Sequence, residues 1–168
     1  MNRRFVTTLV LAVVVGLFVY AFLGFKGKTE AVKVGMPAYD FQREDLTGKQ
    51  IKLSDYKGKV VVLNFFTTWC PPCIEEAPEL QKFEDAYKDK AKLLIIDRQE
   101  PKERVQKFVQ EKKSTSTYLL DIDDSLAKKY GVVGQPETFV IDRQGIIREH
   151  IKGPVTFDSL VQMVKKYE

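Results

Sequence analysis

Cys70 and Cys73 are the two cysteines of the chain, and they stand two residues apart as C-x-x-C. Residues 60–63 before them are all apolar, which predicts a buried strand. Between residues 74 and 83 apolar side chains recur at helical spacing. The pair is therefore predicted where a strand gives way to a helix, with the first cysteine at the helix N-terminus. The two intervening prolines fit, because a first helical turn tolerates proline.

This placement has a chemical consequence for Cys70. The free N–H groups and dipole of a helix start stabilise a negative charge, so we expect them to favour the Cys70 thiolate. A thiolate is the attacking species in disulfide exchange. Cys73, one turn into the helix, is expected to be buried, protonated and placed to attack a mixed disulfide on Cys70. The prediction is a two-cysteine redox site whose Cys70–Cys73 disulfide is its own redox group, without a separate cofactor.

Two other uses of a C-x-x-C pair fit less well. A structural zinc site needs two further cysteine or histidine ligands, and the chain offers only His150, on a predicted hairpin strand away from the cysteines. We therefore expect no metal site. An inert structural disulfide would close a loop too short to remove much chain entropy, so it would stabilise little.

The first 25 residues differ from the rest of the chain. Residues 5–25 form a run of 21 residues without a charge. As a helix this run would span about 30 Å, the thickness of a bilayer's hydrocarbon core. We expect residues 1–25 to be a cytoplasmic stub and an uncleaved transmembrane anchor, residues 26–35 a polar tether, and residues 36–168 the redox domain. Lysines and arginines flank the run on both sides, so counting them does not decide its orientation.

The remaining sequence predicts one α/β domain. Net charge is +4, from 27 Lys+Arg and 23 Asp+Glu, which gives no argument for nucleic-acid binding. Strands separated by helices, followed by a last hairpin and helix, predict a central mixed sheet flanked by helices on both faces. The predicted strands are 39–41, 51–53, 59–66, 92–97, 117–121, 137–142 and 146–151, and the predicted helices are 72–88, 103–112, 125–130 and 157–167.

With these motifs the chain resembles the thioredoxin superfamily, and more narrowly the membrane-anchored TlpA/ResA/CcmG-like thiol-disulfide oxidoreductases. The residues that carry the resemblance are 53–59 (LSDYKGK), 64–66 (NFF), 69–73 (WCPPC) with Glu76, and 130–139 (YGVVGQPETF). It implies a thioredoxin-like fold with an added N-terminal β-hairpin and a single N-terminal transmembrane helix. It also implies an extracytoplasmic redox domain on the cell membrane.

The resemblance further implies a client and an electron donor. Such proteins reduce the haem-binding cysteines of apocytochrome c, and a membrane protein of the CcdA/DsbD type keeps them reduced. It also implies that Pro136 is cis and lies against the C-x-x-C pair. The residues alone favour an ordinary trans proline there, since only about 5–6% of X-Pro bonds are cis.

Glu76 is the predicted acid/base partner of the cysteines. Thioredoxins usually carry a buried Asp where this chain has Asn64, and an amide cannot take a proton from Cys73. Glu76 lies three residues after Cys73, on the same helical face, and the resemblance marks an acidic residue there as functional. A carboxylate at this place opposes thiolate formation, so we expect a reducing rather than a strongly oxidising site. The alternative is a solvated glutamate that only favours the helix dipole.

Candidate substrate-binding residues surround the cysteines: Trp69, Pro72, Gln135, Pro136 and Glu137. Three other functions remain open. One is a general envelope or spore-protein disulfide reductase. Another is a thiol peroxidase, because Thr67 and Cys70 match part of a T-x-x-C motif, although Leu63 stands where that motif has proline. The last is a binding module on a thioredoxin scaffold without catalysis.

Overall fold

The computed structural model describes residues 11–18 and 31–168, which fall in two compact units, Met1–Glu30 and Ala31–Glu168. Residues 11–18 are helical, and their apolar side chains, such as Leu11 and Phe18, are exposed. Within the described residues no helix has both the length and the apolar character needed to cross a membrane. The rest of the predicted anchor, and residues 26–30 of the predicted tether, lie outside the described residues.

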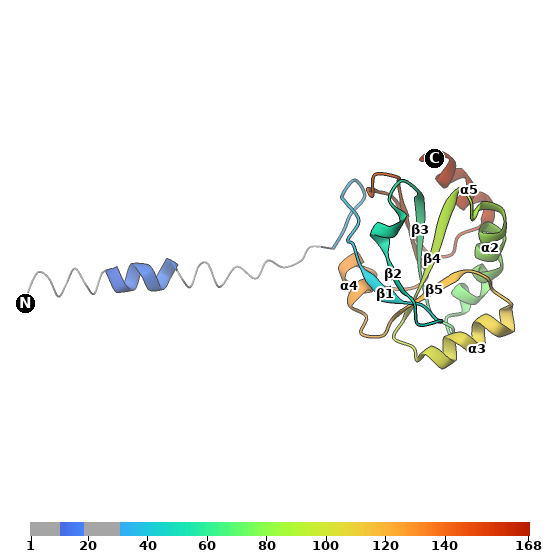
Figure 1. Cartoon of the computed structure of the whole chain (residues 1–168), viewed down its shortest axis with the longest axis horizontal. Coiled ribbons are helices and arrows are strands. Elements are labelled where there is room, and N and C mark those ends of the chain that lie inside the picture. The colour runs from blue at the N-terminus through green and yellow to red at the C-terminus, as the bar shows by residue number, and fades with distance from the viewer. Residues whose placement is uncertain (1–10, 19–30) are drawn as a thin grey trace, which may run out of the picture. The chain divides into compact units, whose positions relative to one another are not determined.

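A five-stranded mixed sheet forms the centre of the domain, in the order β5-β4-β3-β6-β7 (Figure 1). Three strands are parallel, namely β3 (Val60–Phe66), β4 (Ala91–Arg98) and β5 (Thr117–Asp121). The strand β6 (Glu137–Ile141) pairs antiparallel with β3, and β7 (Ile147–Lys152) pairs antiparallel with β6. The predicted mixed sheet is confirmed. Because β3, β4 and β5 are parallel, their carboxyl ends lie at one edge of the sheet, and β3 leads there into the cysteine pair.

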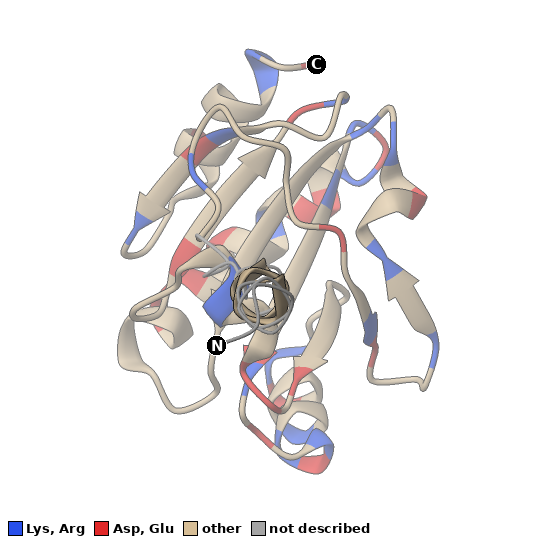
Figure 2. Ribbon diagram, turned by 90° about the vertical axis from the view of Figure 1, so that its left-hand side faces the viewer, with Lys and Arg blue, Asp and Glu red and all other residues tan. Residues whose placement is uncertain are grey.

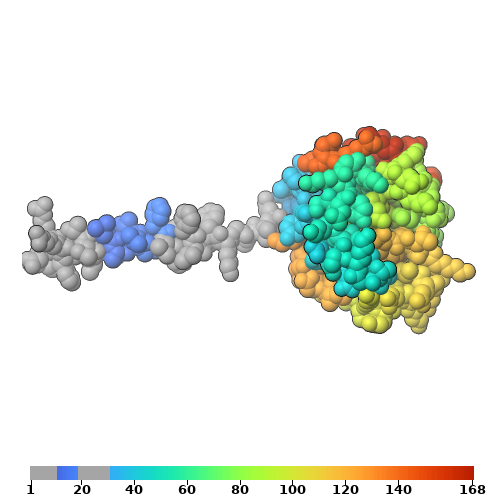
Figure 3. Space-filling view, viewed as in Figure 1, coloured from blue at the N-terminus to red at the C-terminus, as the bar shows by residue number. Residues whose placement is uncertain are grey.

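Helices cover both faces of this sheet, as predicted. The first face is covered by α2 (Pro71–Tyr87), α3 (Lys102–Lys112) and α5 (Phe157–Lys165). The second face is covered by α4 (Ser125–Tyr130), the hairpin of β1 (Gln42–Glu44) and β2 (Gln50–Lys52), and the 3-10 turn η1 (Leu53–Tyr56). The hairpin and η1 form much of the surface seen in Figure 3.

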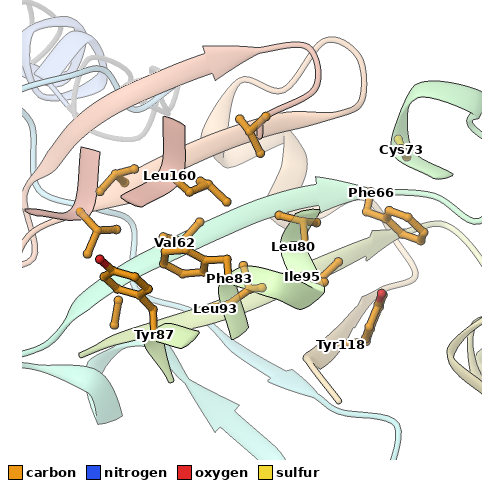
Figure 4. Close-up of a cluster of buried hydrophobic side chains, with 14 of the residues drawn as sticks. Val62, Phe66, Cys73, Leu80, Phe83, Tyr87, Leu93, Ile95, Tyr118 and Leu160 are labelled. Carbon is orange, nitrogen blue, oxygen red and sulfur yellow. The ribbon is translucent and has the colours of Figure 1, made fainter. Parts of the chain in front are cut away.

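The core beneath α2 extends to the cysteines. Leu80 and Phe83 of α2 are fully buried against apolar residues of β3 and β4, and Leu160 of α5 packs into the same cluster (Figure 4). Cys73 lies at the end of this cluster, near Phe66. Burying a Leu or Phe side chain stabilises a fold by about 1.5–3 kcal/mol, so this packing fixes α2, and with it Cys73, on the sheet.

The added N-terminal hairpin is also confirmed, with one shift. Its first strand is Gln42–Glu44 and not residues 39–41, and Phe41, just before the strand, is buried in the core. The side of the ribbon seen in Figure 2 carries basic and acidic residues interspersed, without a single-sign stripe. That mixture agrees with the charge balance of the sequence.

Candidate active site

Cys70 caps the N-terminus of α2, and Cys73 lies in its first turn. Pro71 and Pro72 occupy the first two helical positions, where a missing N–H costs nothing. No acidic residue falls in this first turn; Glu75 and Glu76 follow it. The positive end of the helix dipole is therefore not neutralised by a carboxylate of the first turn, and it faces Cys70.

Both cysteines are free thiols, and they differ in access. Cys73 is fully buried, while Cys70 is 5% exposed. Burial raises the pKa of Cys73 strongly, the hydrogen bond with Cys70 raises it further, and the nearby Glu76 adds to the same direction. Cys73 is thus a protonated thiol at neutral pH, as a resolving cysteine that waits for a mixed disulfide requires.

Glu76 is 2% exposed, so it is not the solvated first-turn residue of the alternative reading. Its Oε1 accepts a hydrogen bond of 2.9 Å from Asn64 Nδ2, and its Oε2 accepts one of 2.9 Å from the Val155 backbone N–H. Burial raises the pKa of Glu76 to about 7, although these two hydrogen bonds favour the charged form. A carboxyl group that titrates near neutral pH can both take and return a proton in this pH range.

Asn64 of β3 connects the sheet to this carboxyl group. It is fully buried, and its Nδ2 also contacts Thr138 Oγ1 of β6 at 3.0 Å. Its Oδ1 has no hydrogen-bond partner within the part of the chain that the structure describes. An amide in place of an aspartate therefore serves as a donor to Glu76, and Glu76 is the carboxyl group that acts on the resolving cysteine.

The loop before β6 lies against Cys70. The Gln135–Pro136 peptide bond is cis, as the resemblance implied. Cys70 Sγ donates to the Gln135 backbone carbonyl over 3.5 Å. Pro136 is buried and Gln135 is half-buried. The cis proline thus places a backbone carbonyl directly beside the attacking sulfur.

Glu137 fixes this loop by accepting hydrogen bonds from its backbone. It is 3% exposed, and its Oε1 accepts hydrogen bonds from the backbone N–H groups of Val133 (3.0 Å) and Gly134 (3.1 Å). Its Oε2 lies 2.6 Å from His150 Nε2 on β7. Glu137 was expected among the substrate-binding residues; with its carboxyl group used in this way, it acts on a bound chain only through the shape of the loop.

Glu100 supports the segment before Cys70, and Asp97 is a second buried carboxyl group beside it. Glu100 accepts from the Thr68 backbone N–H (2.6 Å) and from Thr68 Oγ1 (2.7 Å). Asp97, at the end of β4, is fully buried, and neither of its oxygens has a hydrogen bond among residues 31–168. Burial and the neighbouring Glu100 raise the pKa of Asp97 to about 9, so this group is neutral at pH 7.

The rim of the site is apolar. Trp69 is 61% exposed and Val133 is 85% exposed, while Pro72 is half-buried. Exposed large apolar side chains beside a reactive group indicate a surface that contacts a partner chain. Trp69 is therefore not core packing, which was its alternative role.

Comparison with known proteins agrees with this geometry. The family model that matches residues 34–150 is that of the AhpC/TSA family. The chain belongs to the AhpC/TSA family. It is 35% identical over 164 residues to thiol-disulfide oxidoreductase ResA of Bacillus cereus, covering 97% of this chain and 94% of the relative.

Two solved structures show the same likeness. The thioredoxin domain of a thiol-disulfide oxidoreductase from Bacteroides vulgatus has a TM-score of 0.71 at 28% identity, covering 82% of this chain and 99% of that one. StoA from Bacillus subtilis has a TM-score of 0.67 at 30% identity, covering 80% and 99%. The AhpC/TSA domain described here is thus thioredoxin-like, and the protein is a thiol-disulfide oxidoreductase of the ResA/CcmG type.

The contributors to this AhpC/TSA site that the sequence missed include Glu100, Val155, His150 and Arg98, which donates to Gln135. His150 was expected to lie apart from the site, yet it contacts Glu137 and stacks on Phe139 with ring centroids 4.1 Å apart. Arg98 could have been found, because it ends a parallel strand at the edge where Cys70 lies. Val155 acts through its backbone, so its side-chain type carries no signal.

Proposed function

We propose that this oxidoreductase is anchored in the cell membrane, works on the extracytoplasmic side and reduces protein disulfides, with the haem-binding cysteines of apocytochrome c as its client. The observation that carries the direction of electron flow is the buried Glu76 beside Cys73. A carboxylate at this place raises the pKa of Cys73 and so disfavours its thiolate. A strongly oxidising site needs the opposite, because its reduced form is stabilised as the thiolate.

The reaction uses the two thiols in turn. The Cys70 thiolate attacks one sulfur of the client disulfide, and the other client sulfur leaves as a thiolate that takes up a proton. Cys73 then gives its proton to the Glu76 carboxylate and attacks Cys70 Sγ, which breaks the mixed disulfide. The second client sulfur leaves as a thiolate and takes up a proton. Two electrons pass to the client, and the Cys70–Cys73 disulfide forms. A membrane dithiol donor of the CcdA/DsbD type restores both thiols.

The proposed location in the membrane rests on the N-terminal sequence. Residues 5–25 carry no charge, and the helix at residues 11–18 has an apolar surface with Leu17 and Phe18 exposed. Such a surface is costly in water and stable in lipid. An anchored domain meets a client that is itself delivered across the membrane.

Trapping the client tests this function. In the full-length chain, Cys73→Ser should accumulate a mixed disulfide through Cys70, because the resolving thiol is missing. Cys70→Ser is the matched control and should trap nothing. The probe is an oxidised peptide with the haem-attachment sequence C-x-x-C-H. If Cys73→Ser folds and traps no such peptide, the client is wrong.

Two further measurements separate the alternatives. A redox titration against glutathione should give a potential nearer to about −270 mV, as in thioredoxin, than to about −120 mV, as in DsbA. Rapid consumption of peroxide by the reduced protein would instead favour the thiol peroxidase. A cellular role that survives replacement of both cysteines by serine would favour the binding module.

A further inference from the structure

Arg98 is the last residue of β4, at the sheet edge where the cysteine loop begins. Its side chain is 12% exposed and forms a two-pronged ion pair with Asp124, from Nε to Oδ1 at 2.8 Å and from Nη2 to Oδ2 at 3.2 Å. The Asp124 side chain is 10% exposed. The charge of this guanidinium is therefore already balanced by one carboxylate.

The remaining guanidinium nitrogen of Arg98, Nη1, binds Gln135 and not Asp124. It donates to the side-chain Oε1 of Gln135 over 2.9 Å. Gln135 Nε2 in turn contacts Thr67 Oγ1 at 3.4 Å, and the Gln135 backbone carbonyl is the group beside Cys70 Sγ. The side chain of the residue before the cis proline is thus held between the end of β4 and the segment that leads to Cys70.

Only an arginine can make this arrangement. Its planar fork offers parallel donors to a carboxylate and a further donor at a fixed angle, whereas lysine is a flexible point charge. Arg148 and Asp142 form a second Arg–Asp ion pair in the same domain, with atoms 2.6 Å apart, but no hydrogen bond found from Arg148 within the described domain reaches the cysteine or cis-proline segments. The link to the active site is therefore made by Arg98 and is not shared by Arg148.

We propose that Arg98 is a positioning residue that fixes Gln135, so that the cis-Pro136 loop is already ordered when an extended client chain docks beside Cys70. This inference rests on the thiol-disulfide exchange activity and not on the identity of the client. A polypeptide pairs with the backbone at Gln135 and gains from its order. A small disulfide reaches Cys70 without pairing with this backbone, so the order of the loop does not strengthen its binding.

Removing the link should therefore change docking more than chemistry. If Arg98→Leu frees the Gln135 side chain and its loop, binding must order them again. Immobilising such a side chain weakens binding by about threefold to tenfold. We expect the KM for a polypeptide disulfide to rise by this factor, while kcat stays within about twofold.

The test compares two substrates on the full-length protein. Insulin is the polypeptide disulfide and cystamine is the small one. Arg98→Leu and Arg98→Lys should both raise the KM for insulin and leave the rate with cystamine within about twofold of wild type. Arg148→Leu, which breaks the Arg148–Asp142 pair, should change neither. The cystamine rate of the wild type reports exchange activity by itself, so failure of that activity is distinguishable from failure of the role of Arg98.

A double-mutant cycle shows whether Arg98 acts through Gln135. Gln135→Met removes the acceptor at similar length and should raise the insulin KM by itself. Adding Arg98→Lys to it should raise the KM no further, because coupled residues are not additive. Full additivity, an equal loss with cystamine, or an unchanged insulin KM in Arg98→Lys would each overturn the proposal. The lysine variant keeps the charge opposite Asp124, so it decides the question should the leucine variant not fold.

Discussion

Asn64 on β3 donates its side-chain amide to Glu76 on α2 over 2.9 Å, in a place where both side chains are almost fully buried. This hydrogen bond joins the sheet to the helix directly beside Cys73. It fixes the carboxyl group that we propose takes the proton of the resolving thiol. Most of the following predictions concern the protonation of this glutamate.

Glu76→Gln should slow the second step of exchange, in which Cys73 attacks the mixed disulfide. Losing a positioned general base costs about 100-fold or more in rate. Because the pKa of Glu76 is about 7, the wild-type rate should rise through neutral pH as this carboxyl ionises, and the variant should lack that rise. Rapid-quench release of a peptide thiol from the mixed disulfide measures the step.

Glu75→Gln is the matched control, since Glu75 is an exposed neighbour on the same helix. It should stay within about twofold of wild type, as a group remote from the proton would. Equal losses in both variants would assign the effect to charge near the helix start and remove Glu76 from the mechanism.

Glu76 should also make folding stability depend on pH. Its pKa is raised on folding, so between about pH 4.5 and 7 the folded chain holds a proton that the unfolded chain has lost. The free energy of unfolding therefore falls as pH rises through this window, by about 3 kcal/mol for this group. Below this window Glu76 is protonated in both the folded and the unfolded chain, so the free energy of unfolding no longer changes with pH on its account.

Urea denaturation at several pH values measures this dependence. The difference in unfolding free energy between wild type and Glu76→Gln isolates the contribution of Glu76. The raised pKa of Asp97 contributes a pH dependence of the same direction to both proteins and cancels in this difference. The variant should gain stability relative to wild type as pH rises from 4.5 to 7.5. A constant difference across that range would show that Glu76 titrates normally in the folded state.

Asn64→Asp should place a second carboxyl group against Glu76. Two buried carboxyl groups at hydrogen-bond distance share one proton and cannot both ionise cheaply. We expect the variant to lose about 3 kcal/mol more stability at pH 8 than at pH 5, since an unpaired buried charge costs about this much. Thermal unfolding at both pH values tests it, and Gln42→Glu, the same kind of change at an exposed position, should show no such difference.

Glu137→Gln should weaken the loop before the cis proline. Burial by itself raises the pKa of Glu137, but hydrogen bonds from Gly134, His150 and Val133 outweigh it and lower the pKa. A lowered pKa means stability that is present above the unfolded value and lost as pH falls through the folded one. The variant should lose about 1–3 kcal/mol at pH 7, and the loss should shrink below pH 4.

Hydrogen exchange at Val133 and Gly134 locates the effect of that variant. Their amide protons should exchange faster, because each donates to the Glu137 carboxylate, and the neutral amide oxygen of glutamine accepts these hydrogen bonds more weakly. Glu103→Gln, an exposed change on α3, should leave both amides as they are. Unchanged protection in Glu137→Gln would show that other contacts hold the loop.

The sequence by itself determined the local parts of this protein. The apolar run before Cys70 and the helical repeat after Cys73 predicted the strand, the helix and the thiol at its start, because these depend on neighbours along the chain. The central mixed sheet with helices on both faces also followed from the alternation of strands and helices along the chain. The spacing of Glu76 from Cys73 placed it on the same helical face as the cysteine, and its role as the acid/base partner stays a prediction.

Only the tertiary structure decided what surrounds those parts. Asn64 meets Glu76 and Thr138, Arg98 meets Gln135, and His150 meets Glu137 because the sheet order brings strands that are far apart in sequence to one edge. The backbone N–H of Val155 holds Glu76 whatever side chain that residue carries. A carboxyl group acquires a raised pKa from burial, and burial depends on how distant segments pack, which no local pattern specifies.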